Sequence, residues 1–174
     1  MNNKIYKSEK FKTMLHYIIS KCESQDNFGR VVLHKLLYFS DFNNYEKFEK
    51  SISGESYIRK RTGPVPVHFS TAITELINEN KINEISEVVI NYSKYKYSSL
   101  AEPNLNSITK KEQQVIDDTI NRISHFNSKK ISEYSHGDIP LRLANEGESL
   151  NYEAVFYRDP EYSVRAYDDD GFRI

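Results

Sequence analysis

An unbroken helical stripe near the start of the chain constrains the fold more than any other feature. Its apolar residues recur at i, i+3, i+4, i+7, i+8 and i+11, which places them on one face of an α-helix. They are Phe11, Met14, Leu15, Ile18, Ile19 and Cys22. Ser8 precedes the stripe and can cap the N-terminus of the helix. Because such a face must be buried against other elements, the pattern predicts a packed, helix-rich domain.

A second apolar face follows the polar stretch that ends at Gly29. It is broad, which is typical of a central helix contacted on more than one side. Its residues are Val32, Leu33, Leu36, Leu37 and Phe39. This segment therefore predicts the helix around which the others pack.

Three later segments also show helical patterning. One starts after Pro66, carries apolar residues from Phe69 to Ile77 and ends near Asn80, a residue that tolerates the left-handed conformation at a helix end. Another starts at Thr109, which forms a capping box with Glu112. A shorter one runs from Ser128 through Tyr134. The helical content thus extends over most of the chain.

The segment 88–97 has β-strand patterning. Val88, Ile90 and Tyr92 alternate with polar residues, and Tyr95 and Tyr97 alternate with lysines, which predicts a small antiparallel hairpin. The segment 62–66, Thr-Gly-Pro-Val-Pro, is expected to be extended. We interpret 152–157 as a strand or an extended tail, and about 166–174 as a flexible tail.

These patterns give the fold class as mostly α (α+β): a compact helical domain with a small antiparallel β-hairpin. No linker or repeat divides the chain, so we expect a single domain over residues 1–174. Three helices followed by a hairpin also allow a winged-helix-like N-terminal half.

Charge and composition exclude several classes of protein. The chain has 24 Lys and Arg against 25 Asp and Glu, a net charge of −1, which argues against a strongly basic nucleic-acid binder. A single cysteine leaves no intrachain disulfide. No apolar run approaches the roughly 18 residues of a membrane span, and the first residues lack the apolar segment of a signal peptide. We therefore expect a cytoplasmic protein without membrane contact.

Residues that carry chemistry are sparse. The five histidines, at positions 16, 34, 68, 125 and 136, show no i, i+4 pair that would mark a helical metal site. No phosphate-binding loop, dinucleotide fingerprint or nucleophile elbow is present. Cys22 ends an apolar stripe and is interpreted as a small buried residue. We expect no enzyme activity, no metal and no cofactor.

A basic run, Arg59, Lys60 and Arg61, precedes the third helix, and Lys94 and Lys96 lie in the predicted hairpin. One interpretation is that these five residues contact nucleic-acid phosphates in a winged-helix-like regulator. The other is that the lysines protect an edge strand from pairing with other chains. The balanced net charge favours the second interpretation.

Tyrosine is unusually frequent, with 13 residues. Its side chain offers a large rigid contact area with a polar tip, and protein interfaces are enriched in it. Exposed tyrosines therefore favour an interaction surface over a catalytic site.

Three blocks in fixed order resemble the Panacea family, the SocA-like antitoxin-associated domains of phage- and prophage-associated proteins. They are Lys-Leu-Leu-Tyr-Phe-Ser-Asp at 35–41, Ile-Ser-Gly-Glu-Ser-Tyr at 52–57 and Thr-Gly-Pro-Val-Pro at 62–66. Weaker similarity extends from the first helix to about Arg165. Two positions depart from the family pattern: Asn80 stands where Gly is common, and Leu141 where Trp is common.

The resemblance implies the antitoxin of a two-protein toxin–antitoxin pair, which neutralises a cognate toxin protein by direct binding. One branch of the family resembles an adaptor that presents its toxin to a ClpXP-type protease. Neither branch implies an enzyme.

The shared blocks have two physical interpretations. Tyr38 and Asp41 lie three residues apart on one helix face, where hydrogen bonds could hold the loop that carries Tyr57 and residues 63–65. Alternatively, the same residues shape a groove for the partner, lined by Tyr38, Tyr57, Pro64, Val65 and His68. The candidate partner-binding residues are Tyr38, Asp41, Tyr57, Arg59, Arg61, Gly63, Pro64, Val65 and His68.

Overall fold

The computed structural model describes residues 5–167. Its elements, in chain order, are α1 (Ser8–Cys22), α2 (Arg30–Phe48), β1 (Tyr57–Lys60), β2 (Gly63–Pro66), α3 (Phe69–Asn78), β3 (Ile82–Val89), β4 (Tyr92–Ser99), α4 (Lys110–Ile123), α5 (Ser128–His136), α6 (Ile139–Arg142) and the 3-10 helix η1 (Tyr152–Tyr157). The predicted α+β class, mostly helical with a small antiparallel hairpin, is confirmed.

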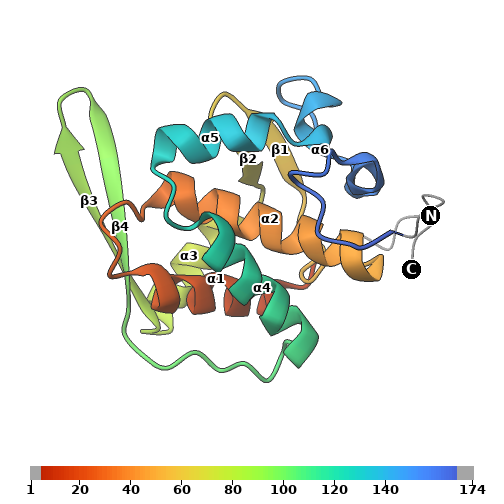
Figure 1. The fold of residues 1–174 in the computed structure, drawn as a ribbon. Coiled ribbons are helices and arrows are strands. Elements are labelled where there is room, and N and C mark those ends of the chain that lie inside the picture. The colour runs from red at the N-terminus through yellow and green to blue at the C-terminus, as the bar shows by residue number, and fades with distance from the viewer. Residues whose placement is uncertain (1–4, 168–174) are drawn as a thin grey trace.

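Helix α2 lies at the centre of the fold (Figure 1). It packs against α1, α4, α5, β2 and η1, and every residue from Val32 to Asn44 is buried. The broad apolar face of the sequence therefore does mark the central helix. A helix enclosed on all sides must bury its polar side chains too, and those of α2 supply most of the contacts considered below.

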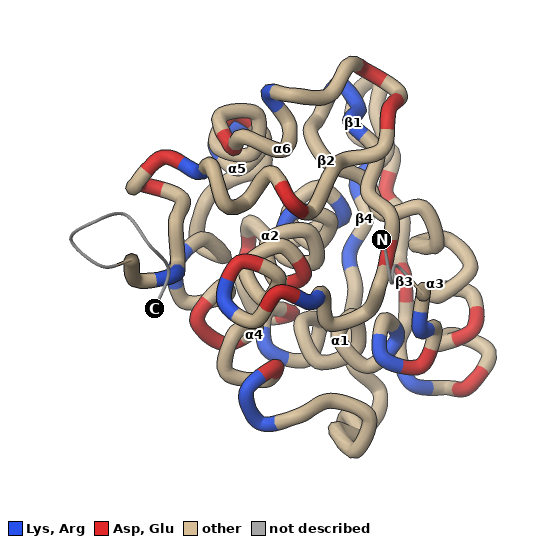
Figure 2. The backbone as a smooth tube through the Cα atoms, turned by 90° about the vertical axis from the view of Figure 1, so that its right-hand side faces the viewer, with Lys and Arg blue, Asp and Glu red and all other residues tan. Residues whose placement is uncertain are grey.

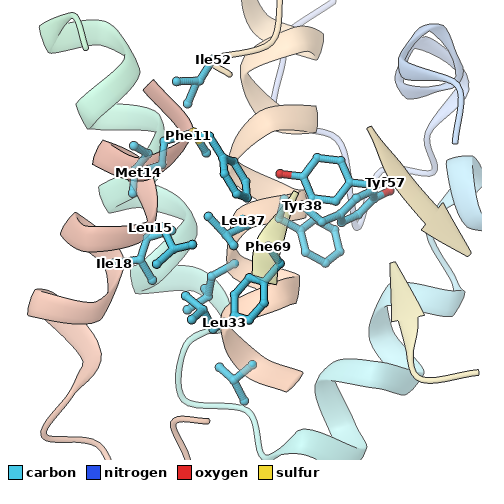
Figure 3. Close-up of a cluster of buried hydrophobic side chains, with 14 of the residues drawn as sticks. Phe11, Met14, Leu15, Ile18, Leu33, Leu37, Tyr38, Ile52, Tyr57 and Phe69 are labelled. Carbon is cyan, nitrogen blue, oxygen red and sulfur yellow. The ribbon is translucent and has the colours of Figure 1, made fainter. Parts of the chain in front are cut away.

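The core is formed where α1 meets α2. Figure 3 shows Phe11, Met14 and Ile18 directed from α1 toward the side chains of α2, which include Leu33 and Leu37. All five are fully buried. Burial of each such side chain contributes roughly 1.5–3 kcal/mol, so this contact is a main source of stability.

Local signals at two helix ends agree with the structure. Thr109 accepts a hydrogen bond from the backbone of Glu112, and the Glu112 side chain bonds back to Thr109, which completes the predicted capping box. Asn80, just after α3, has φ +58°, the left-handed conformation that the sequence led us to expect there.

Two hairpins are present, where the sequence indicated one. β1 and β2 pair antiparallel from Tyr57 opposite Pro66 to Lys60 opposite Gly63, so the extended segment 62–66 is one arm of a hairpin. β3 and β4 pair from Ile82 opposite Ser99 to Val89 opposite Tyr92, a longer hairpin than predicted. The extra hairpin separates α2 from α3, and the other follows α3 as predicted.

The interpretation of 152–157 as a strand or extended tail was wrong. The segment is the 3-10 helix η1, because the Asn151 side chain caps its start and the Tyr152 ring stacks on Phe42 at 4.1 Å. After η1 the chain returns to α2, where Tyr167 bonds to Glu46 at 3.1 Å. The rest of the predicted flexible tail, 168–174, lies outside the described residues. None of the helices between residues 5 and 167 has the length and apolar character of a membrane span.

Candidate functional site

Asp41, in the middle of α2, holds the segment that leads into β1. Its Oδ1 accepts the backbone N–H groups of Ile52 and Ser53, both at 2.9 Å. Its Oδ2 accepts the hydroxyl of Ser53 at 2.6 Å and that of Tyr57 at 2.7 Å. We call Asp41, Ile52, Ser53 and Tyr57 the clasp. It fixes β1 relative to the central helix, as the first interpretation of the motif proposed.

Every group that contacts the Asp41 carboxylate is a donor. Burial raises the pKa of Asp41 to about 6, although the bonds from Ser53, Tyr57 and Ile52 act in the opposite direction. At neutral pH the group is therefore ionised, and both of its oxygens are satisfied.

Tyr38 has a different partner from the one expected. Its hydroxyl donates to Asp138 at 2.8 Å, at the start of α6, and not to the segment between Tyr57 and Val65. Asp138 also receives the guanidinium of Arg158 at 2.7 Å, and the same guanidinium donates to Glu46 at 3.0 Å. The side chains of Arg158, Asp138 and Glu46 are all buried. Tyr38 thus anchors the C-terminal part of the chain.

Lys35 is a buried base beside β2. Its ammonium group donates to the carbonyl of Pro64 at 3.3 Å, and burial lowers its pKa to about 7. Gly63 has φ +111°, and a Cβ there would lie 2.8 Å from Lys35 Cε and 2.4 Å from Ser135 Oγ. Only glycine fits this close approach of β2 to α2 and α5.

Glu55 and His68 connect the clasp to the surface. Glu55 is fully buried and accepts from the backbone N–H of His68 at 2.8 Å and from its Nδ1 at 2.7 Å. The Tyr6 ring stacks on the imidazole at 3.9 Å. The His68 side chain is 40% exposed and the adjacent Val67 is 50% exposed. A buried carboxylate therefore orients an exposed histidine at the start of α3.

The structure divides the predicted partner-binding residues into two groups. Five are buried in this structure and present no side chain to the surface: Tyr38, Asp41, Tyr57, Gly63 and Pro64. Three of them, Tyr38, Tyr57 and Pro64, were expected to line the groove, so of its lining only Val65 and His68 remain accessible, and partner binding there stays a prediction. Arg59 is half-buried and donates to the carbonyls of Leu141 and Ala144 at 2.6 and 2.9 Å. Arg61, Val65 and His68 reach the surface.

The surface residues near the first hairpin are Ile58, Lys60 and Val65 on one side of its strands, Arg61 in its turn, and Val67 and His68 just after its second strand. Ile58 lies opposite Val65 in the register, and both are half-buried on the side away from Tyr57 and Pro66. We define the outer face as Ile58, Lys60, Arg61, Val65, Val67 and His68. It combines apolar side chains with basic ones. His136, whose role the sequence left open, contacts the carbonyl of Arg61 with Nε2 at 2.9 Å and supports the turn of this hairpin.

The residues of the nucleic-acid interpretation do not form a single surface. Arg59, Lys60 and Arg61 belong to the first hairpin, whereas Lys94 and Lys96 belong to β4 in a separate sheet. Lys96 donates to the carbonyl of Asp26 at 3.0 Å. Figure 2 shows basic and acidic residues interspersed along the chain.

Helix α3, the recognition helix of that interpretation, contains no Lys or Arg. It carries Glu75, and Glu79 follows at its C-terminus; both pair with Lys12, at 3.3 and 2.5 Å. Nucleic-acid binding through α3 needs a basic stripe, and this helix does not provide one.

Metal-binding groups do not cluster in the described part of the chain. Among residues 5–167, no cluster of three or more His, Cys, Asp or Glu side chains could hold a metal ion. Cys22 is fully buried, and burial raises the pKa of its thiol to about 12. This agrees with its interpretation as a small buried residue, because only the thiolate is nucleophilic.

Four residues that make the buried polar contacts described above were not among the predicted site residues: Lys35, Glu55, Asp138 and Arg158. Lys35 had a detectable signal, since it lies three residues after Val32 and four before Phe39 in an apolar stripe. Glu55 lies in the block at 52–57 that carries the family resemblance, whereas Asp138 and Arg158 are ordinary charged residues outside the quoted blocks, and only long-range contacts reveal their roles.

Comparison with known proteins gave one match. A family model described as antitoxin SocA-like, Panacea domain, matches residues 33–140. This range includes the clasp, both hairpins and Asp138, but excludes α1 and the segment that carries Arg158, so it is shorter than the similarity from the first helix to Arg165. The comparisons with curated proteins and with solved structures give no match.

Proposed function

Because the chain belongs to the SocA-like antitoxin family with the Panacea domain, we propose that it neutralises a toxin protein by binding it directly. The observation that carries the proposal is the way buried motif residues hold the outer face of the first hairpin. Asp41 and Tyr57 fix β1, and Glu55 fixes His68. The buried residues of the family motif therefore support a surface to which the motif itself contributes Val65.

The composition of the outer face fits a protein partner. Ile58, Val65 and Val67 supply its apolar side chains, and Lys60, Arg61 and His68 supply its polar ones. Apolar centres with polar rims are typical of protein interfaces. We expect the toxin to present apolar side chains bordered by carboxylates. The proposed binding involves no chemical step, so the protein acts without being an enzyme.

The proposed mechanism is occlusion. The outer face is held by buried hydrogen bonds, so little conformational entropy is lost when it binds, and an interface of roughly 1,600 Å² in total would suffice. A proteolysis adaptor would need a further surface for a ClpXP-type protease. No contact among the described residues indicates such a surface, so we favour occlusion over the adaptor mechanism.

Co-expression with the protein encoded by the neighbouring reading frame tests the mechanism. Occlusion predicts that growth is restored while the toxin's half-life stays unchanged. Shortening of the half-life, without inhibition of the purified toxin by the purified antitoxin, would show an adaptor and contradict occlusion. Growth arrest in the presence of folded antitoxin would contradict neutralisation altogether.

A further inference from the structure

The outer edge of β3 is unpaired. β3 pairs on one side with β4, and a two-residue turn, Ile90–Asn91, joins the strands between Val89 and Tyr92. The Ser99 N–H, in β4, points away from β3 and donates to Glu23 at 2.9 Å. Because directions alternate along a strand, the backbone groups of Ile82, Glu84, Ser86 and Val88 point outward from β3, and of these residues only Ile82, at the base of the strand, is buried. Between residues 5 and 167, no backbone group from outside the hairpin bonds to Glu84, Ser86 or Val88.

This edge lacks the lysines, prolines and bulges that commonly prevent pairing, and its charged residues are Glu84 and Glu87. Natural edge strands carry lysines, prolines or bulges. β3 has none of these: its sequence is Ile-Asn-Glu-Ile-Ser-Glu-Val-Val, and its register with β4 is continuous over eight pairs. Lys94 and Lys96, which the sequence analysis assigned to edge protection, lie on β4. The exposed strand is therefore the one without lysine.

The same hairpin exposes apolar side chains near its tip. Val88 is 86% and Ile90 is 85% exposed, and Ile85 and Tyr92 are also exposed. Figure 1 shows the hairpin standing at one side of the helices, with its tip extending past them. An isolated two-stranded hairpin is marginally stable in water, so additional strands would stabilise it.

We propose that β3 pairs antiparallel with β3 of a second copy of this chain, about a two-fold axis at Ser86. Ile82 is buried, and an axis at Ser86 is the one that pairs the three other outward residues, Glu84, Ser86 and Val88, with one another. This axis places Ser86 opposite Ser86 and Glu84 opposite Val88 of the second copy. On the other face of the sheet, Ile85 lies opposite Glu87. No like charges face each other, so the edge is complementary to itself.

The resulting sheet has four strands, in the order β4, β3, β3, β4. The antiparallel arrangement brings the apolar tip, with Val88 and Ile90, next to the base of the other hairpin and covers part of its surface. Backbone pairing over one short edge is a small interface, so the dimer dissociates on dilution. The outer face of the first hairpin takes no part in it, so toxin binding and dimerisation are separable.

Sedimentation equilibrium of the full chain, from low to high micromolar concentration, tests the proposal. Ser86→Lys and Ser86→Glu each place like charges at the axis, and each should weaken dimerisation at least about tenfold. An equimolar mixture of the two variants should restore it, because Lys then faces Glu. Ser93→Lys, on the same face of the hairpin but on β4, is the matched control and should dimerise like the wild type.

Three results would overturn the proposal. They are a wild-type chain that stays monomeric throughout the range, a mixture that associates no better than the single variants, and a Ser93→Lys variant as weak as Ser86→Lys. If Ser86→Lys reduces toxin binding while the wild type alone is a monomer, the edge receives a strand of the toxin and not a second copy. Ser86 is exposed, so circular dichroism should show the wild-type fold in every variant.

Discussion

Tyr57 donates its hydroxyl hydrogen to Asp41 at 2.7 Å, and this contact joins the first hairpin to the centre of α2 across 16 residues of sequence. Both side chains are buried. Most of the residues that carry the family resemblance therefore act below the surface, and the exposed residues of the first hairpin, Val65 among them, are available to a partner.

Removal of the Tyr57 hydroxyl tests the clasp. Tyr57→Phe keeps the buried ring but leaves the Asp41 carboxylate with one donor fewer. A hydrogen bond to a charged group contributes about 1.5–3 kcal/mol, and the free energy of unfolding in urea should fall by that amount. Tyr157→Phe, at an exposed position, is the control and should change stability little. Equal stabilities of the two variants would mean that the clasp contributes nothing.

Lys35 should make stability depend on pH. Its pKa is about 7 in the folded protein against 10.5 normally, so between these values the unfolded chain binds the extra proton. The free energy of unfolding therefore rises with pH over that window, by up to about 1.4 kcal/mol per unit, and below pH 7 the contribution is constant. Lys35→Met removes this dependence and should stabilise the protein at pH 7.

Urea denaturation of the wild type and of Lys35→Met at pH 7, 8 and 9 measures the effect. The advantage of the methionine variant should shrink as the pH rises, since less free energy is then needed to keep the wild-type lysine neutral. Other titrating groups, including the buried His34, are common to both proteins and cancel in the difference. An advantage that is constant over this range would contradict a neutral Lys35.

Arg158 should be essential for stability. Its buried guanidinium compensates both Asp138 and Glu46, so Arg158→Met leaves two buried carboxylates without their cation. Breaking a buried pair in this way costs about 3–5 kcal/mol. Arg142→Met removes an exposed pair with Asp159 and should cost less than about 1 kcal/mol. Thermal unfolding compares the two, and similar losses would show that the buried network has no special role.

Much of the fold was predictable because its signals are local. The stripe from Phe11 to Cys22, the capping box at Thr109 and the turn at Asn80 each depend on residues close in sequence. The first hairpin was missed because its position depends on distant partners. β1 is held by Asp41 on one side, and on the other Arg59 pairs with the backbone of residues 147 and 148.

The candidate site was predictable only in part. The spacing of Tyr38 and Asp41 placed them on one face of a helix, and one of the two interpretations allowed hydrogen bonds from there to the loop that carries Tyr57, as the bond from Tyr57 to Asp41 now shows. The partner of Tyr38 could not be predicted from the spacing, because Asp138 lies 100 residues away in the sequence. A sequence motif indicates which residues belong to one structural unit. The tertiary contacts determine which of these residues are buried and which remain exposed.

The central claim is that the toxin binds the outer face of the first hairpin. Isothermal titration calorimetry with the neighbouring gene's protein tests it with two variants, Val67→Glu on that face and Leu143→Glu at an exposed apolar position elsewhere. Val67→Glu should weaken binding at least about tenfold, and Leu143→Glu should bind like the wild type. Wild-type affinity of a folded Val67→Glu variant would contradict the central claim.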